Sequence, residues 1–146
     1  MKKQASINLV TKEFNTEKLA IDKAKKLLGD RFTHEVGPTI MQFGDKLSND
    51  FKDCYWMLKS ASNDSIYLSP SNQQLYHVIC FDIYDGYLNA DGYGLVSSIF
   101  AYSHLSHLGS TAFIHTYADM FYKLKQIARV HPESEALLQA TNTLSV

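Results

Sequence analysis

Hydrophobic residues recur at helical spacing at both ends of the chain, and between these ends they alternate or run together as they do in strands. Residues 15–30, NTEKLAIDKAKKLLGD, place several apolar side chains near one side of a helix, namely Leu19, Ala20, Leu27 and Leu28. Asn15 or Thr16 is expected to cap the start of this helix, and Gly29 is expected to end it. The pattern therefore predicts a first amphipathic helix.

A second helix is predicted after Pro38, because proline is favoured in the first turn of a helix. Ile40, Phe43 and Leu47 then follow at helical spacing. Gly44 lies inside this helix and weakens it by about 1 kcal/mol relative to alanine. We therefore expect tertiary packing to hold this helix in place.

A first β-hairpin is predicted over residues 54–70. In the strand CYWMLKS, residues 54–60, successive side chains are expected to point to opposite faces. Tyr55, Met57 and Lys59 share one face. Trp56 lies on the other face and is expected to pack into the core. ASND, residues 61–64, has turn chemistry, and SIYLSP, residues 65–70, is the expected return strand, which Pro70 ends.

Two further strands are predicted between residues 74 and 90. QLYHVICFDIY, residues 74–84, is the run richest in β-branched and aromatic residues, and this composition favours a central strand. An Asp85-Gly86 turn is expected to lead into a short fourth strand.

The C-terminal half has helical patterns. Asp91 is the expected N-cap of a helix over residues 92–108, and Gly109 lies at its C-terminal side. Thr111 opens the next helix, whose apolar face consists of Phe113, Ile114, Tyr117, Phe121, Leu124 and Ile127.

That helix is expected to end near His131, because a proline disfavours a helical residue before it. Pro132 then fits the first turn of a last helix, with Glu133 and Glu135 near the positive end of its dipole. Together these elements predict an α+β fold, in which a small antiparallel sheet of about three or four strands packs with N-terminal and C-terminal helices.

A length of 146 residues predicts a single domain over residues 1–146, with residues 1–14 as a loose N-terminal tail. No stretch reaches the ~18 apolar residues that a membrane span needs, and the N-terminal residues lack the apolar region of a signal peptide. Cys54 and Cys80 lie in apolar runs, and we expect them to be buried thiols of a cytoplasmic protein.

The charge pattern bears on the class of partner. The formal net charge is -1, from 14 basic and 15 acidic residues. Nucleic-acid binders usually carry a basic excess, and a DNA mimic needs a strong acidic one, so neither class is favoured. Residues 60–122 contain no Lys or Arg and five Asp, which makes direct nucleic-acid binding by this part still less favoured.

The candidates for chemistry have few recognisable patterns. His104 and His107 lie three residues apart on one helical face, and with His115 they are the residues of a possible zinc site. The serines lie in no nucleophile elbow, and the glycines form no phosphate loop. Asp82 and Asp85 are better explained by a turn than by a shared acid–base site. We expect no metal and no cofactor.

Tyrosines are frequent in and beside the predicted strands, at positions 55, 67, 76, 84, 87 and 93. Tyrosine is enriched at protein interfaces and also lines cores with its hydroxyl hydrogen-bonded. Both interpretations stay open from the sequence. On the outer face of the first hairpin, Tyr55 and Tyr67 are the candidates for contact with a partner.

Several sequence landmarks occur in a fixed order, namely Tyr55-Trp56, Tyr67 to Pro70, Asn89-Ala90-Asp91, Tyr122, Leu124 and His131-Pro132-Glu133. This order resembles the antirestriction protein family of the ArdB and KlcA type, over about residues 30–142. The chain departs from the family pattern in the hairpin turn, where Ser62-Asn63-Asp64 replaces Asn-Gly-Gly. It departs again at Asn142, where the family has an acidic residue.

The resemblance implies an antirestriction protein that helps the DNA of plasmids and phages evade type I restriction-modification. It implies action by protein–protein contact, with no enzyme activity and no DNA mimicry, on the host type I restriction enzyme or an associated host factor. Tyr55, Tyr67, Asp91 and Glu133 form the candidate interaction surface. The alternatives are a small metal-dependent hydrolase that uses His104, His107 and His115, or a nucleic-acid binding module. The pattern leaves the oligomeric state open.

Overall fold

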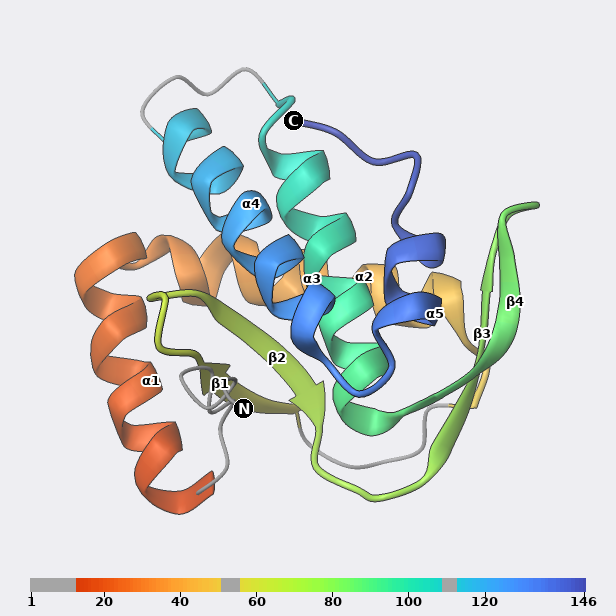
Figure 1. Cartoon of the computed structure of the whole chain (residues 1–146). Coiled ribbons are helices and arrows are strands. Elements are labelled where there is room, and N and C mark those ends of the chain that lie inside the picture. Colours follow the sequence, from red (N-terminus) through yellow and green to blue (C-terminus); the bar gives the residue numbers. More distant parts are fainter. Residues whose placement is uncertain (1–12, 51–55, 109–112) are drawn as a thin grey trace.

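The computed structural model describes residues 13–50, 56–108 and 113–146 (Figure 1). The elements follow in the order α1 (Glu13–Leu28), the π-helix η2 (Phe32–Val36), α2 (Gly37–Leu47), β1 (Trp56–Ser60), β2 (Ile66–Pro70), β3 (Leu75–Cys80), β4 (Tyr84–Asn89), α3 (Ala90–Leu105), α4 (Ile114–Val130) and α5 (Ser134–Ala140). Helices and antiparallel strands thus combine in an α+β fold, as the sequence predicted.

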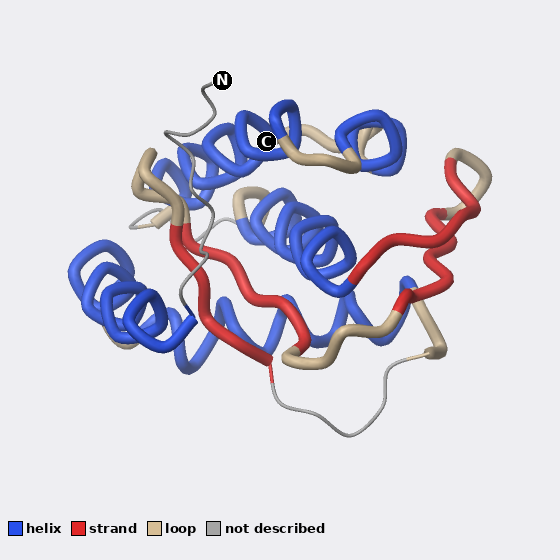
Figure 2. The backbone as a smooth tube through the Cα atoms, turned by 60° about the horizontal axis from the view of Figure 1, so that its bottom comes forward, coloured by secondary structure: helices blue, strands red, loops and turns tan. Residues whose placement is uncertain are grey.

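Helix α3 forms the centre of the molecule. Fourteen of its sixteen residues are buried, so it has almost no polar face. Both views place it between α4, α2 and the two hairpins (Figures 1 and 2). It approaches β2 so closely that a side chain at Gly94 would overlap the backbone of Leu68 and Ser69.

The four strands form two separate antiparallel hairpins within the described residues, and not one sheet (Figure 2). In the first, β1 pairs with β2, and Lys59 lies directly opposite Tyr67. In the second, β3 pairs with β4, and His77 lies opposite Tyr87. The prediction that residues 74–84 form a central strand is wrong, because among the described strands β3 pairs with β4 alone, and Leu75 and Ile79 of β3 are exposed.

The turn of the second hairpin lies earlier than the sequence predicted. It covers residues 81–83, and Ile83 donates its N–H to the carbonyl oxygen of Cys80. Asp85 and Gly86 are paired residues inside β4, opposite Ile79 and Val78. The Asp-Gly turn prediction is therefore wrong, because the strand pairing extends through both residues.

The first hairpin has its turn where the sequence placed it, and this turn is tied to two helices. The side-chain amide of Asn63 donates to the carbonyl oxygen of Lys123 in α4 at 3.0 Å. Asp64, with φ of 66°, forms an ion pair with Lys23 of α1 at 3.0 Å. The turn residues that depart from the family pattern are thus bound to the body of the protein.

The N-terminal helices begin at different residues from those predicted. Helix α1 starts at Glu13, so the predicted start of the helix at Asn15 or Thr16 is wrong, and both positions lie within it. It ends as predicted before Gly29, whose φ of 60° suits a residue without a side chain. Helix α2 has Pro38 in its first turn, but the π-helix η2 precedes it.

Gly44 of α2 shows why that helix tolerates a glycine. A side chain there would come within 2.9 Å of both the Trp56 ring and the Tyr93 hydroxyl. Trp56 is half-buried and packs against the core, and the Tyr93 hydroxyl donates to the Gly44 carbonyl oxygen at 2.6 Å. The helix is thus held by packing, as we expected.

The C-terminal elements largely follow the prediction. Helix α4 ends at Val130, directly before His131, and α5 begins at Ser134 with Glu135 in its first turn. The prediction that Pro132 lies in the first turn of this helix is wrong, because the chain turns first, with the N–H of Ser134 donating to the carbonyl oxygen of His131. Cys80 is a buried free thiol, and burial raises its pKa to about 11. Gly109, Thr111 and Cys54 lie outside the described residues. No helix within the described ranges is both long and apolar enough to cross a membrane.

Candidate functional site

One carboxylate joins three parts of the chain at the N-terminal end of α3. Oδ1 of Asp91 accepts hydrogen bonds from Nζ of Lys59 at 2.7 Å and from the hydroxyl of Tyr67 at 2.8 Å. Its Oδ2 lies 2.8 Å from Nε2 of His131. We call these four residues the Asp91 cluster. Lys59 and Tyr67 reach the same carboxylate because they face each other across the β1–β2 pair.

The electrostatics of the Asp91 cluster keep Asp91 ionised. Burial alone would raise the pKa of Asp91, but the hydrogen bond from His131 and the charge and hydrogen bond of Lys59 outweigh it, so the pKa lies well below 3.8. Burial, followed by the charge of Asp91, raises the pKa of Tyr67 well above 10.0. Tyr67 therefore remains a phenol that donates to a carboxylate.

His131 is fixed in one tautomer by its two neighbours. Its Nδ1 accepts the backbone N–H of Glu133 at 3.0 Å, so the ring proton is on Nε2, which donates to Asp91. The ring is almost completely buried. It connects the junction of α4 and α5 to the start of α3.

Glu133 and Asn89 complete the N-terminal end of α3. Oδ1 of Asn89 accepts the N–H of Gly92 at 2.8 Å, so Asn89 is the N-cap. Oε2 of Glu133 accepts the N–H of Asn89 at 3.0 Å, which places a second carboxylate at the positive end of the helix. The prediction that Asp91 is the N-cap is wrong, because its carboxylate binds Lys59, Tyr67 and His131 instead of the backbone of the helix.

A polar cavity of about 160 Å³ adjoins the Asp91 cluster. Its walls include Met57, Lys59, Asn72, Asn89 and Asp91. Asp91 accepts three hydrogen bonds, and both ring nitrogens of His131 are occupied. The geometry thus offers neither an activated nucleophile nor a free general base, and it suits a structural junction beside a polar depression.

Three of the four residues predicted to form an interaction surface meet at this junction, namely Tyr67, Asp91 and Glu133. Tyr55 lies outside the described residues. The expectation that Tyr67 lies on the exposed face of its hairpin is wrong, because its side chain is fully buried against Asp91. Asp91 and Glu133 retain partial exposure.

Sequence reasoning missed Lys59 and His131 as members of the site. Lys59 is the one charged residue of the strand WMLKS, and a lysine is rarely buried in a protein unless it is paired. That signal could have indicated an acidic partner. No comparable signal marked His131, because its role depends on how α4 and α5 meet.

The tyrosines divide between core and surface. Tyr67, Tyr76 and Tyr93 are fully buried, and the rings of Tyr76 and Tyr93 stack with their centroids 4.3 Å apart. Tyr84 is half-buried and Tyr87 is exposed. The core interpretation therefore holds for three of the five described tyrosines, and the exposed Tyr87 is compatible with the interface interpretation.

The alternative site of three histidines does not assemble. His104 packs edge-on against Phe43, and Nε2 of His107 lies 3.2 Å from the carbonyl oxygen of Ser145. His115 lies on the first turn of α4. Over residues 13–50, 56–108 and 113–146, no three His, Cys, Asp or Glu side chains come together in a way that could hold a metal ion.

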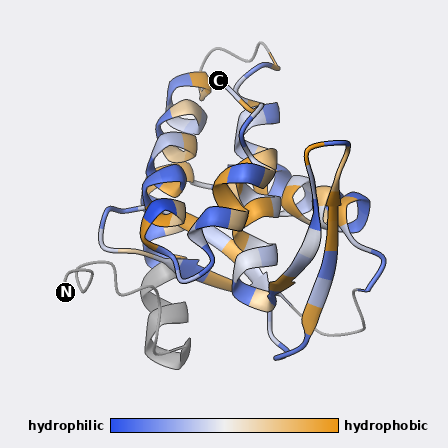
Figure 3. Ribbon diagram, turned by 45° about the vertical axis from the view of Figure 1, so that its right-hand side comes forward, coloured by the Kyte–Doolittle hydropathy of each residue, from blue (hydrophilic) through white to orange (hydrophobic). Residues whose placement is uncertain are grey.

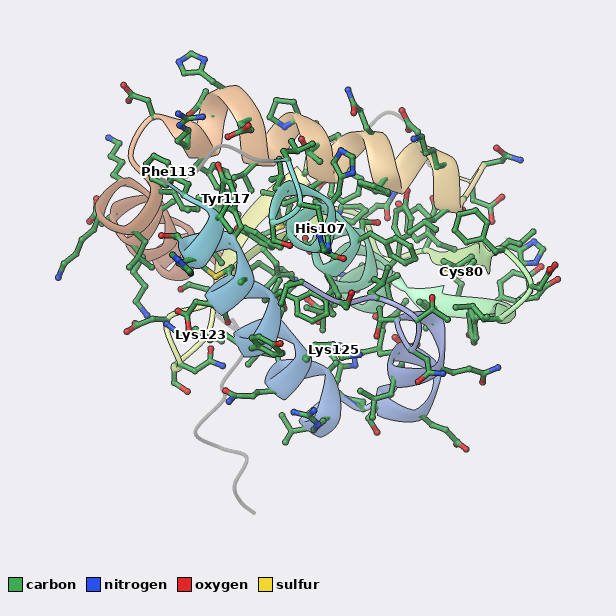
Figure 4. All side chains as sticks on the ribbon, turned by 90° about the horizontal axis from the view of Figure 1, so that it is seen from above. Cys80, His107, Phe113, Tyr117, Lys123 and Lys125 are labelled. Atoms are coloured by element: carbon green, nitrogen blue, oxygen red, sulfur yellow. The ribbon has the colours of Figure 1, made fainter. Side chains whose placement is uncertain are left out.

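A second polar group joins η2 to α4 near the labelled rings of Figure 4. The hydroxyl of Tyr117 donates to Glu35, which also forms an ion pair with Arg31 at 3.1 Å. Arg31 lies 4.9 Å from the centre of the Phe113 ring, and that ring stacks on Tyr117. Burial, and then the hydrogen bond to Glu35, raises the pKa of Tyr117 well above 10.0. The Tyr117 hydroxyl and Oε1 of Glu35 are thus paired, and the group connects η2 to α4.

Comparison with known families identifies the chain. A family model described as antirestriction protein matches residues 49–142, which is more than half of the 146 residues. The chain belongs to the antirestriction protein family. All residues of the Asp91 cluster, together with Asn89 and Glu133, lie within the range that this family model matches.

A solved structure supports the fold of this antirestriction family member. It is described as that of the KlcA and ArdB proteins, with a novel fold and with antirestriction activity against type I DNA restriction systems in vivo but not in vitro. The alignment has a TM-score of 0.75 and 22% sequence identity, and it covers 85% of this chain and 89% of the other. The two chains therefore share a fold. A comparison with curated proteins finds no match.

Proposed function

We propose that this protein protects incoming DNA from type I restriction-modification systems of its host. The observation that carries the proposal is the family match over residues 49–142. The shared fold with the KlcA and ArdB structure adds support, because that structure is described as active against type I systems. As the site of action we propose the cytoplasm, where restriction enzymes meet incoming DNA. The proposal treats residues 1–146 as one antirestriction-like domain.

The proposed mode of action is contact with a protein, without catalysis. The saturated hydrogen bonding of Asp91 and His131 supports this, because a catalytic base needs a free acceptor near its substrate. In this proposal the Asp91 cluster has a positioning role. It fixes the start of α3, and β4 leads directly into that helix at Asn89.

The charge of the chain supports a protein target over nucleic acid. A formal net charge of -1 gives neither the basic surface of a DNA binder nor the dense acidic surface of a DNA mimic. The proposed partner is the type I restriction enzyme or a host factor that acts with it. The related structure is described as active in vivo but not in vitro, which favours a requirement for a cellular component.

The proposal is tested with a plasmid that expresses the protein in a strain with an active type I system. Unmodified phage is plated on this strain and on the same strain with an empty plasmid, and methylation of the host recognition sites is measured in parallel. The expected result is restored plating with unchanged methylation. Equal restriction on both strains, with the protein present and folded, would contradict the proposal.

A further inference from the structure

The outer face and the turn of the β3–β4 hairpin carry four exposed apolar side chains, which alternate on the strands with His77, Asp85 and Asn89. Leu75 is 60% exposed, Ile79 45%, Phe81 82% and Tyr87 62%. We call these four residues the hairpin patch. On the opposite face, Tyr76, Val78 and Leu88 are completely buried. Figure 3 shows hydrophobic residues along this hairpin, which stands at one side of the helices. Exposed large apolar side chains that gather on one face and are rimmed by polar residues can mark an interaction site.

Phe81 gives a second and independent indication. Its φ is 49°, a left-handed conformation that glycine and asparagine adopt more readily than phenylalanine. No packing offsets this backbone cost, because the ring is the most exposed of the large hydrophobic side chains described. An exposed phenylalanine in this conformation does not serve the fold, so we infer that it serves a contact.

The hairpin is held firmly at both edges, which leaves its outer face for recognition. On the β3 side, the N–H of His77 donates to Oδ2 of Asp50 at 2.8 Å. On the β4 side, the amide of Gln139 donates to the carbonyl oxygen of Ile83 at 2.8 Å, and Glu133 accepts the N–H of Asn89. These contacts occupy backbone groups that an added strand would use, so side-chain contact is favoured over strand addition.

The charged groups around the patch are mainly acidic. Asp82 lies in the turn, Asp85 lies in β4 with its Oδ1 2.6 Å from Nε2 of His77, and Asp50 lies beside β3. Lys46 is the basic residue that lines a cavity of about 180 Å³ together with His77 and Ile79. Among the described residues, three carboxylates against one lysine favour a basic partner surface, and they disfavour nucleic acid and anionic lipid. A symmetric contact between two copies would bring like carboxylates together.

We propose that the hairpin patch is the partner-binding surface, and that it inserts Phe81 and Tyr87 into an apolar pocket rimmed by Lys and Arg on a host protein. Aromatic anchors surrounded by polar groups are the usual centres of protein interfaces. The inference deepens the proposed function and rests on it for the biological setting. The geometry of the hairpin patch, however, can be tested without it.

The test uses the full-length protein with a photo-reactive benzoyl-phenylalanine at position 81 or, as the control, at position 108. Leu108 is 52% exposed and follows the C-terminal end of α3. This end of the helix lies away from the β3–β4 hairpin (Figure 1). Both proteins are illuminated in living restricting cells, and the crosslinked protein is identified and purified. Its binding to wild type, Phe81→Asn, Tyr87→Ser and Leu108→Asn is then measured by titration at low and at high salt.

The expected result is a host protein that crosslinks from position 81 and not from position 108. Phe81→Asn and Tyr87→Ser should each weaken its binding by about tenfold or more, Leu108→Asn should leave it unchanged, and high salt should weaken it. The proposal is overturned by crosslinks only to a second copy or to lipid, by equal crosslinking from both positions, or by equal binding of all variants. Failure of wild type to protect DNA, with position-specific crosslinking retained, would reject the proposed function and not the surface.

Discussion

Oδ2 of Asp91 accepts a hydrogen bond from Nε2 of His131 at 2.8 Å, although the two residues lie forty positions apart in the sequence. The bond links the first turn of α3 to the junction between α4 and α5. Lys59 and Tyr67 attach the first hairpin to the same carboxylate. The start of α3, and with it the end of β4, is therefore fixed by contacts from three parts of the chain.

Replacement of Asp91 by alanine should destabilise the protein by about 2 to 3 kcal/mol, because Lys59 and His131 lose their partner in a largely buried setting. The free energy of unfolding from urea titration measures this. The matched control is Asp119→Ala, which removes an exposed ion pair with Lys123 within α4 and should cost less than about 0.5 kcal/mol. Equal losses for the two variants would contradict the role assigned to Asp91.

The pH dependence of stability should report the lowered pKa of Asp91. Because the folded protein holds this pKa below 3.8, ionised Asp91 stabilises the fold above that pH, and the contribution is lost as the pH falls further. The difference in unfolding free energy between wild type and Asp91→Asn should therefore be constant between about pH 7 and 5 and shrink toward about pH 3. A difference that grows on acidification would contradict this assignment.

The close approach of α3 to β2 predicts an unusual cost for a small substitution. Gly94→Ala should lose about 3 kcal/mol or more, because the new methyl group would overlap the backbone of Leu68 and Ser69. Gly44→Ala should lose less, since its neighbours are side-chain atoms of Trp56 and Tyr93 that can shift. Thermal unfolding followed by the fluorescence of the single tryptophan measures both. A Gly94→Ala protein as stable as wild type would show that the two elements pack less tightly than described.

Phe81→Asn should leave stability unchanged or raise it by up to about 1 kcal/mol, because asparagine adopts a positive φ more easily and the exposed ring contributes little packing. Thermal unfolding checks this before any binding experiment is interpreted. A loss of more than about 1 kcal/mol would mean that the ring supports the fold. The positive φ of Phe81 would then no longer indicate a contact surface.

Local patterns in the sequence predicted the elements better than their partners. Helical spacing and Pro132 located α4 and its end, and alternation along residues 56–60 placed Trp56 and Met57 on opposite faces of β1. Neither pattern contains information about which strands pair. The four strands were therefore expected in one sheet, whereas α3 separates them into two hairpins.

The candidate site was predicted in part for the same reason. Asn89 and Asp91 are both good N-cap residues, and only the position of Lys59 and His131 decides that Asn89 caps the helix and Asp91 forms the cluster. Tyr67 was expected at the surface, but a tyrosine in a strand can face either the core or the solvent, and the sequence alone does not decide between them. The hairpin patch was missed because its exposure depends on the absence of a helix over the outer face of β3 and β4 in the described part of the chain.

The proposed function and the hairpin patch are tested most directly by the efficiency of plating of unmodified phage on a type I restricting strain that expresses wild type, Phe81→Asn or Leu108→Asn at equal levels. Wild type and Leu108→Asn are expected to restore plating by the same factor, while Phe81→Asn, although folded, loses most of that protection. Restriction that is unchanged by wild type would contradict the proposed function, and protection by Phe81→Asn equal to that of wild type would contradict the role of the hairpin patch.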